Sequence, residues 1–258
     1  MKGAFVTDDA KDAFAAYVAR MLAPARERYG LEHVPGEPEA VTIFRPGMIS
    51  WLAREAHDQD VLDFAQEQAW RYLEDPTSID PSLASRVLGL AAIDGDQALF
   101  DEYRQRFETA TVPGDRRRYL FAMGSFEDEA LKQQAIDYIL TGPLRPQELF
   151  TIPFAMGRDR ESGDRLYSWM EAHYDAILER IPPPYAIYLP YFASGCSTDR
   201  LDRARVFFTE PEHVVPGTIR ELAKVEEQVM QCVDLRAREG ERVVAYLSEG
   251  LAMSEASD

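Results

Sequence analysis

Residues 116–131 read RRRYLFAMGSFEDEAL, a pattern typical of one helix that ends, a tight turn, and a second helix that begins. Tyr119 and Met123 lie one helical turn apart on an apolar face, and Gly124 is a residue type that commonly ends a helix. Ser125 can cap the next helix, whose N-terminus is favoured by the acidic run that follows. The stretch predicts a helical hairpin. If Gly124 has a positive φ, replacing it with valine should cost about 1 kcal/mol or more.

Similar hairpins recur along the chain. The second helix of each pair is expected to begin near Asp58, Asp96, Asp128, Gly163 and Thr198. The interval of roughly 32 to 38 residues is typical of stacked helical pairs. Four of these starts lie at or beside polar turns (DQD, DGD, EDE and STD) that can cap a helix. No segment has a sustained strand period, so the predicted fold class is all-α: a HEAT- or armadillo-like right-handed superhelix of helical pairs that forms a curved bowl.

The expected domain organisation is one helical-repeat domain over residues 1–250, followed by a disordered tail over residues 251–258. The proline-rich residues 32–46 are predicted as a loop, and a helix is expected to resume at Met48. A last long helical pattern begins after Gly217. The other expected helices cover residues 8–29, 58–73, 83–93, 97–107, 147–156, 164–181, 185–192 and 201–208.

The charge balance excludes several kinds of partner. The 258 residues include 45 acidic and 28 basic side chains, which give a net charge of −17. A nucleic-acid-binding protein needs a basic face, and an anionic membrane surface attracts basic segments. We therefore expect neither nucleic acid nor membrane as a partner, and interpret the acidic excess as a solvated surface.

The two cysteines, Cys196 and Cys232, are far apart in the sequence and belong to no CxxC pair. We expect two free thiols in a reducing compartment rather than a zinc site or a disulfide framework. The first residues lack the apolar core of a signal peptide, and no run of about 18 apolar residues is present. The expected location is cytoplasmic.

No catalytic or metal-binding motif is found in the sequence. The four histidines are scattered, and there is no HExxH, no GxSxG elbow and no phosphate-binding glycine loop. We therefore expect no catalytic residue, no metal ligand and no cofactor in this chain.

Two clusters are candidate peptide-binding sites. Arg116, Arg117 and Arg118 form a basic patch in an acidic chain, and arginine suits bidentate pairing with a carboxylate. The alternative is intramolecular salt bridging to neighbouring acidic residues. The second cluster includes Tyr185 and Tyr188 in the segment PPPYAIYLPYF, where tyrosines recur at every third position and could line a peptide groove. The alternative is a core seam with the hydroxyl groups at its edge.

The amino-acid sequences of several stretches resemble motifs of a known family. RRRYLFAMGSFEDEAL is similar to the R-x-x-L-x-A-L-G…D-x-x-L signature in the C-terminal domain of zinc aminopeptidases of the puromycin-sensitive and endoplasmic-reticulum type. GRDRESGDRLYSWMEAHYDAIL (157–178) and FASGCSTDRLDRARVFF (192–208) resemble two later stretches of that domain, and AREGERVVAYL resembles its closing helix. In the second stretch Trp169 is displaced by one place, and Tyr174 stands where a tryptophan is usual. The resemblance covers nearly the whole chain in the right order.

The resemblance implies a non-catalytic role. In such enzymes a separate upstream domain carries the HExxH zinc site, and the C-terminal domain closes over the cleft and contacts the distal part of the peptide. The implied partners are the catalytic domain of the parent enzyme and its peptide substrates, and the implied zinc is in that missing domain. We therefore expect no hydrolysis by this chain alone. The alternatives are an independent helical-repeat scaffold for protein partners and an all-α enzyme with an unrecognised site.

Overall fold

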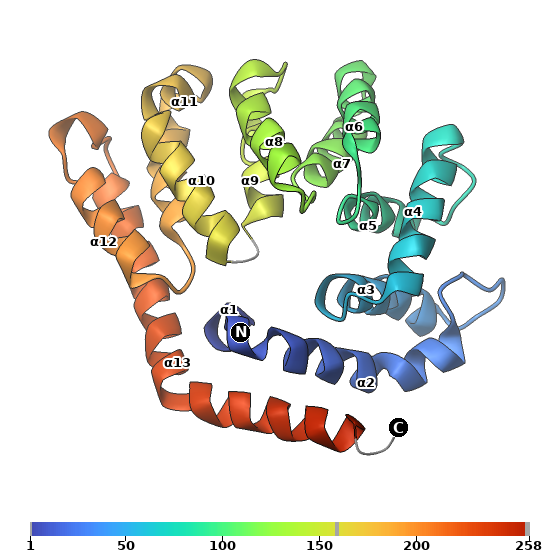
Figure 1. Ribbon diagram of the computed structural model, residues 1–258. Coiled ribbons are helices and arrows are strands. Elements are labelled where there is room, and N and C mark those ends of the chain that lie inside the picture. The colour runs from blue at the N-terminus through green and yellow to red at the C-terminus, as the bar shows by residue number, and fades with distance from the viewer. Residues whose placement is uncertain (1, 158–159, 256–258) are drawn as a thin grey trace. The chain divides into compact units, whose positions relative to one another are not determined.

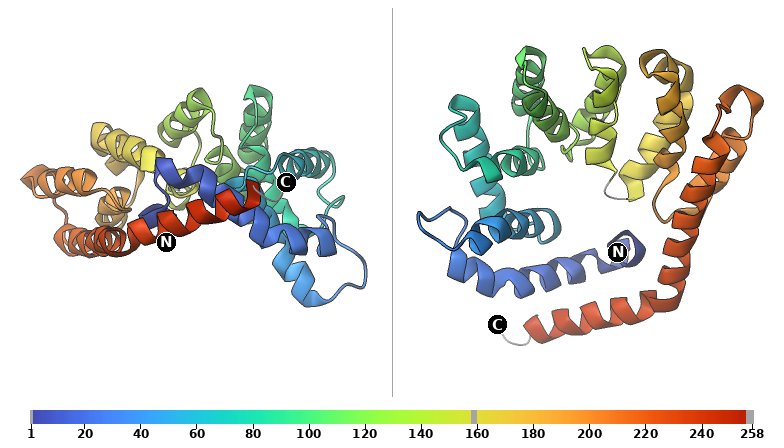
Figure 2. Two further views of the ribbon diagram at one scale, coloured as in Figure 1. Left: turned by 60° about the horizontal axis from the view of Figure 1, so that its bottom comes forward. Right: turned by 180° about the vertical axis from the view of Figure 1, so that it is seen from behind.

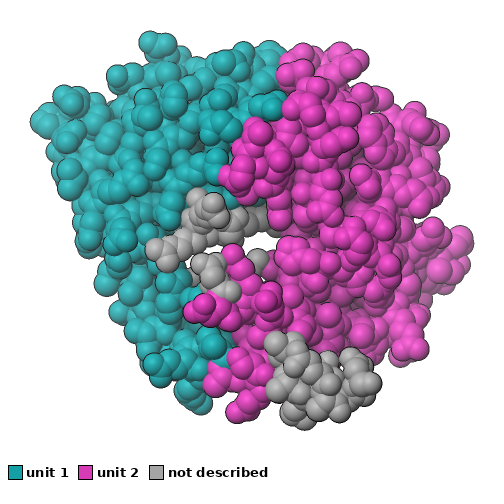
Figure 3. Space-filling view, in the orientation of Figure 1, with its two compact units in different colours: residues 1–7, 133–244 teal, residues 8–132, 245–258 magenta. Residues whose placement is uncertain are grey.

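The structure is a computed structural model, which describes residues 2–157 and 160–255. Within these ranges every regular element is a helix, which confirms the predicted all-α class (Figure 1). None of the described helices is both long enough and apolar enough to span a bilayer. The chain falls into two compact units. Unit 1 comprises residues 1–7 and 133–244, and unit 2 comprises residues 8–132 and 245–258 (Figure 3).

Unit 2 is built from helices that pack against their neighbours in sequence and against the next pair. Pairs α2 with α3, α4 with α5, and α6 with α7 are in contact, and α5 also contacts both α3 and α7. This succession can be followed by colour from blue to green in Figure 2. The elements are η1 (Asp8–Ala10), α2 (Lys11–Tyr29), α3 (Glu39–Glu55), α4 (Gln59–Glu74), α5 (Pro81–Ala91), α6 (Gln97–Thr109) and α7 (Pro113–Met123).

Unit 1 has shorter helices grouped around α10 and η3. Helix α10 packs against α9, α11, α12 and η3, and η3 also packs against α12. Helix α8 (Glu129–Thr141) enters this unit from unit 2. The remaining elements are α1 (Lys2–Phe5), η2 (Pro146–Glu148), α9 (Thr151–Met156), α10 (Arg160–Ala172), α11 (Tyr174–Arg180), η3 (Pro183–Ala193), α12 (Thr198–Phe207), η4 (Pro211–His213) and α13 (Thr218–Glu255), whose residues up to 244 belong to unit 1.

The predicted repeat of helix starts is confirmed. Helices α4, α6, α8, α10 and α12 begin 38, 32, 31 and 38 residues apart. The side chains of Asp58, Asp96 and Asp128 accept hydrogen bonds from amide groups in the first turns of α4, α6 and α8, at 3.0–3.2 Å. Ser197 does the same for α12 at 3.3 Å. These caps supply partners for amide groups that a helix start leaves without intrahelical acceptors.

The hairpin of residues 116–131 forms as predicted, but two of its details are different. Gly124 ends α7 with φ −79°, so it does not occupy the left-handed region and the expected penalty for valine loses its basis. Ser125 donates a hydrogen bond back to the Phe121 carbonyl at 2.9 Å. Asp128 instead caps α8, since its carboxylate accepts from the amides of Ala130 and Leu131 at 2.9 and 3.0 Å.

Three predicted boundaries are wrong. Helix α3 begins at Glu39 inside the segment predicted as a loop, with Pro38 before its first residue and Pro46 within it. Burial of the apolar face of α3 stabilises the helix by more than Pro46 destabilises it through the intrahelical hydrogen bond that proline cannot donate. The helix predicted over residues 164–181 divides at His173, whose φ of −122° is not helical. Helix α13 runs to Glu255, into the predicted tail; residues 256–258 of that tail lie outside the described residues.

The expectation of two free thiols is also wrong, because Cys196 and Cys232 form a disulfide in unit 1. Their Cα atoms are 5.3 Å apart, within the usual range of about 4.4–6.8 Å for a disulfide. The bond joins the loop before α12 to the middle of α13, across 36 residues of sequence. The folding of unit 1, which sequence spacing does not reveal, brings these residues together. The cytoplasmic location stays a prediction.

A buried arginine of α3 forms hydrogen bonds with the loop that precedes this helix. Arg45 is 2% exposed, and its guanidinium donates to both carboxylate oxygens of Glu37 at 2.5 Å. It also donates to the Tyr29 carbonyl at 3.0 Å and to the Gly30 carbonyl at 3.4 Å, at the end of α2. The pairing with Arg45 lowers the pKa of Glu37 to about 2. The arginine therefore connects α2, the loop and α3.

The low pKa of Glu37 predicts a stability change at acid pH. An unfolded glutamate binds its proton near pH 4.5, whereas folded Glu37 stays ionised down to about pH 2. Between these values the unfolded state binds more protons, so the contribution of Glu37 to stability is lost as pH falls from about 4.5 to 2. Urea unfolding of Glu37→Gln at pH 5 and pH 3 should show a weaker acid dependence than the wild type. Exposed Glu67→Gln is the control and should leave this dependence unchanged.

Candidate functional site

The three arginines predicted as a basic patch have different environments on α7. Arg116 is 6% exposed, donates to the Phe107 carbonyl at 3.1 Å and lies 4.1 Å from the centre of the Phe107 ring. Its guanidinium therefore belongs to the interior of unit 2 and is not displayed to a ligand. Arg117 is exposed, and Arg118 is half-buried.

Arg118 forms an intramolecular ion pair, which was the predicted alternative to peptide binding by the arginine patch. Its Nη1 atom lies 2.8 Å from the Asp115 carboxylate and 2.5 Å from the Tyr72 hydroxyl oxygen. Its Nε atom donates to the Ser85 hydroxyl at 2.9 Å. These contacts connect α7 to α4 and α5. Arg117 is thus the member of the triplet with an exposed side chain, and peptide binding at this patch stays a prediction.

The tyrosines of η3 form a row whose first two members are exposed. A 3₁₀ helix has three residues per turn, so side chains three positions apart are eclipsed. The ring centres of Tyr185 and Tyr188 are 6.4 Å apart, and those of Tyr188 and Tyr191 are 6.3 Å apart. Tyr185 and Tyr188 are 40% and 49% exposed, respectively, so these two rings are not a buried core seam. We call Tyr185, Tyr188 and Tyr191 the tyrosine row.

The inner end of the tyrosine row is fixed to α13. The Tyr191 hydroxyl donates to a carboxylate oxygen of buried Glu221 at 3.1 Å. Desolvation by burial, together with this bond to a carboxylate, raises the pKa of Tyr191. Lys224 donates to the same carboxylate at 2.9 and 3.0 Å and is the main cause of a lowered pKa at Glu221. The outer two tyrosines therefore extend from an anchored residue and offer aromatic surface and hydroxyl groups.

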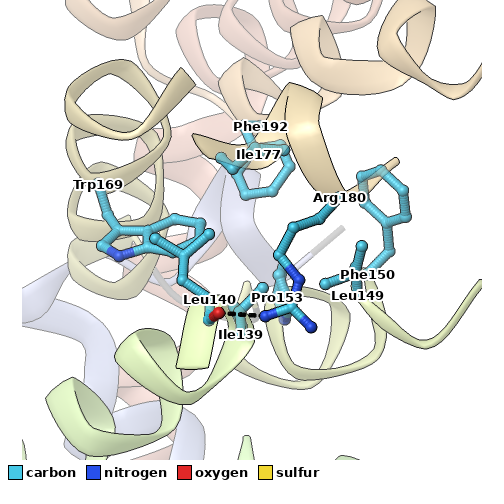
Figure 4. A pocket seen from close by; sticks show the side chains of 9 residues that line it. All are labelled: Ile139, Leu140, Leu149, Phe150, Pro153, Trp169, Ile177, Arg180 and Phe192. Carbon is cyan, nitrogen blue, oxygen red and sulfur yellow. Dashed lines mark hydrogen bonds between the residues drawn. The ribbon is translucent and has the colours of Figure 1, made fainter. Parts of the chain in front are cut away.

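Unit 1 also contains a small apolar pocket, shown in Figure 4. Its space is about 10 Å³, which accommodates no more than a water molecule. The charged member of the lining is Arg180, whose side chain extends toward Leu140 in Figure 4. The lining consists of Ile139, Leu140, Leu149, Phe150, Pro153, Trp169, Ile177, Arg180 and Phe192.

Arg180 has a structural role that the sequence did not reveal. Its guanidinium donates to the carbonyl oxygens of Leu140, Gly142 and Leu144, the last two at 2.8 and 3.3 Å. These carbonyls lie at and beyond the C-terminal end of α8, where a helix has no further intrahelical donors. A positive charge is also favourable at a helix C-terminus. Arg180 thus caps α8 from α11.

Removal of this cap should destabilise unit 1. Arg180→Ala leaves three carbonyls without their charged donor, and we expect a loss of about 2–3 kcal/mol of unfolding free energy. Arg180→Lys retains the charge but cannot bridge three acceptors, so its loss should be smaller. Chemical unfolding followed by circular dichroism measures both. Equal stability of the alanine variant and the wild type would contradict this role.

One group of residues has side chains that could be metal ligands, but its other contacts give no support for a metal site. Among the described residues, Glu210, Glu212 and His213 each place one potential ligand atom within 4.8 Å of the others. Both carboxylates are exposed. The Nδ1 atom of His213 lies 2.9 Å from the Phe207 carbonyl, which can only accept, so Nδ1 carries the proton. The imidazole also stacks on the Phe207 ring with a centroid distance of 3.7 Å. The group is therefore no evidence of a metal site.

The arrangement defines an all-helical domain with paired, capped helices, and no catalytic constellation is found among its described residues. The chain belongs to the family of ERAP1-like C-terminal domains, which its residues 1–231 match. It is also similar to the alanine/arginine aminopeptidase of Saccharomyces cerevisiae (strain ATCC 204508 / S288c), with 29% identity over 135 residues. That match covers 50% of this chain and 15% of the yeast protein. The family resemblance is thereby confirmed.

Proposed function

We propose that the chain acts as the non-catalytic C-terminal domain of a zinc aminopeptidase, where it covers the catalytic cleft and contacts the distal part of the peptide substrate. The family match over residues 1–231 carries this proposal. Zinc and the groups that cleave the peptide bond belong to the catalytic domain, which is the proposed partner. The purified chain, incubated with zinc and amino-acid amides, should show no hydrolysis. Clear turnover would refute the proposal.

Two surfaces suit contact with the distal part of a peptide. The tyrosine row presents flat aromatic rings, which bury a large area with little loss of side-chain entropy. Arg117 presents an exposed cation that could pair with the carboxylate of a peptide C-terminus. Arg117 belongs to unit 2 and the tyrosine row to unit 1, so each surface is tested by its own variant.

Variants at these surfaces should lower the hydrolysis of long peptides without affecting that of short substrates. In the full-length enzyme, Arg117→Ala or Tyr188→Ala should lower kcat/KM for long peptides by about three- to tenfold, the size expected for one exposed contact. Neither change should affect an amino-acid amide, which does not reach the distal site. Arg104→Ala, which removes a surface ion pair with Asp101 on α6, is the control. Unchanged kinetics on long peptides would rule out both contacts.

The alternative is an independent helical-repeat scaffold that binds a protein partner. It is favoured by a stripe on α3, where the large apolar side chains of Ile43, Phe44 and Trp51 are exposed. The gene context discriminates between the two functions. An HExxH-containing domain encoded in the same reading frame supports the aminopeptidase, and its absence from that frame supports the scaffold.

A further inference from the structure

We propose that the Cys196–Cys232 disulfide is a thiol–disulfide exchange site that controls how firmly η3 and its tyrosine row are attached to α13. The proposal does not depend on peptide binding. It concerns the short loop between η3, which ends at Ala193, and α12, which begins at Thr198. The loop is joined to α13 by the disulfide.

Segment η3 and the loop that follows are attached to α13 by one covalent bond and by hydrogen bonds, among them a long one of 3.4 Å from Arg236 to the Cys196 carbonyl. Another is the hydrogen bond from Tyr191 to Glu221 at 3.1 Å. The covalent bond is the disulfide at Cys232, about three helical turns further along α13 than Glu221. A covalent bond holds the loop against α13 more firmly than a hydrogen bond of 3.4 Å, which local opening breaks easily. Reduction would leave the Tyr191 and Arg236 hydrogen bonds without the covalent bond.

Both cysteines are placed where a reductant can reach them. Cys196 and Cys232 are half-buried rather than enclosed, and their neighbours Gly195 and Gln231 are exposed. Gly195 has φ +129°, a conformation that suits glycine and bends the loop beside the disulfide. A disulfide in this position differs from one enclosed in a core, because reduction of an enclosed bond first requires unfolding.

The charges around Cys196 favour its thiolate. Cys196 immediately precedes Ser197, the N-cap of the ten-residue helix α12, and a helix N-terminus stabilises negative charge. The Arg236 guanidinium lies 3.4 Å from the Cys196 carbonyl and also donates to the Ala4 carbonyl at 2.8 Å. Arg200 donates to the Ser194 carbonyl at 2.7 Å.

Acidic groups on the same helices oppose this effect weakly. Asp199 on α12 and Asp234 on α13 are both exposed, so solvent screens their charges. Arg200 also pairs with Asp164 of α10 at 2.7 Å, which offsets part of its charge, whereas Arg236 is held by its bonds to the main chain. Reactive cysteines occur in partly exposed, electropositive surroundings of this kind.

The reaction is an exchange with a dithiol reductant. A thiolate of the dithiol attacks one sulfur of the Cys196–Cys232 bond and forms a mixed disulfide, while the other cysteine leaves as a thiolate and is protonated. The second thiol of the reductant then attacks the mixed disulfide and releases the first cysteine. Two electrons and two protons pass from the dithiol, which is oxidised to its own disulfide, to the two cysteines.

Hydrogen exchange of the purified chain, with and without dithiothreitol, tests the proposal. We expect native-state reduction to raise exchange in residues 183–199 by about tenfold or more, because local opening becomes easier when a tether is lost. Amides of α5 should be unaffected, and reoxidation should restore protection. The double variant Cys196→Ser/Cys232→Ser should show the exchange of the reduced protein in both buffers.

Three results would overturn the proposal. The first is unchanged exchange in residues 183–199 after mass spectrometry has verified complete reduction. The second is a disulfide that dithiothreitol reduces only after denaturant is added, which would make it a static crosslink. The third is an α10 core that exchanges as fast as residues 183–199 in the reduced protein, because the segment would then open only together with the whole unit.

Discussion

Replacement of Arg45 by methionine is expected to lower the free energy of unfolding by about 3 kcal/mol. Methionine fills similar space but removes the donors for the Tyr29 and Gly30 carbonyls and both bonds to the Glu37 carboxylate. Half-buried Glu37 then loses its guanidinium partner and keeps the Thr42 hydroxyl at 2.9 Å and the His33 imidazole at 2.7 Å, and removal of one member of a largely buried pair is destabilising. Urea unfolding at pH 7, followed by circular dichroism, measures the loss.

Two further variants show whether the loss comes from the buried pair. Arg104→Met removes an ion pair with Asp101 in which both side chains are more than 40% exposed, and it should change stability by less than about 1 kcal/mol. The double variant Arg45→Met/Glu37→Leu should recover part of the loss, because no unpaired charge remains. If the double variant is less stable than Arg45→Met, the unpaired carboxylate is not the main cause.

The helix pairs could be predicted because their signals are local. Asp58, Asp96 and Asp128 cap helices through amide groups two or three residues away, so the sequence contains the complete motif. Between these caps the apolar residues repeat at helical spacing, and the predicted face of α4 is buried at Val61 and Ala65. The family match over residues 1–231 includes all of these helix pairs.

The features that could not be predicted depend on contacts distant in sequence. Pro46 argued for a loop, yet α3 contains it because Arg45 is fixed by partners 8 to 16 residues away. Arg116 was expected at the surface, but its guanidinium lies over the ring of Phe107 on the preceding helix. The segment around Tyr188 is predicted as a helix and forms a 3₁₀ helix; the three-residue spacing of its tyrosines fits that form as well as an α-helix. The local sequence has no signature of the first two outcomes, and its three-residue period does not decide the third.

The cysteine pair has the largest expected effect on unit 1. The chain-entropy treatment of a crosslink across 36 residues gives a stabilisation of about 4 kcal/mol, because the bond restricts the unfolded chain. Replacing both Cys196 and Cys232 with serine should therefore lower the free energy of unfolding by about that amount. For a unit of this size the melting temperature should fall by on the order of 10–15 °C. Calorimetry of the wild type and the variant under non-reducing conditions measures the shift.

The crosslink, rather than the change of side chain, should account for this loss. Dithiothreitol should lower the melting temperature of the wild type to that of the double serine variant, and should have no effect on the variant itself. Each single serine variant should melt at the same low temperature, since one cysteine cannot form the bond. A wild type that is insensitive to the reductant, after complete reduction has been verified, would mean that packing around α13 and the Tyr191–Glu221 contact suffices to hold η3. The serine variants would then have to resemble the oxidised protein in stability as well.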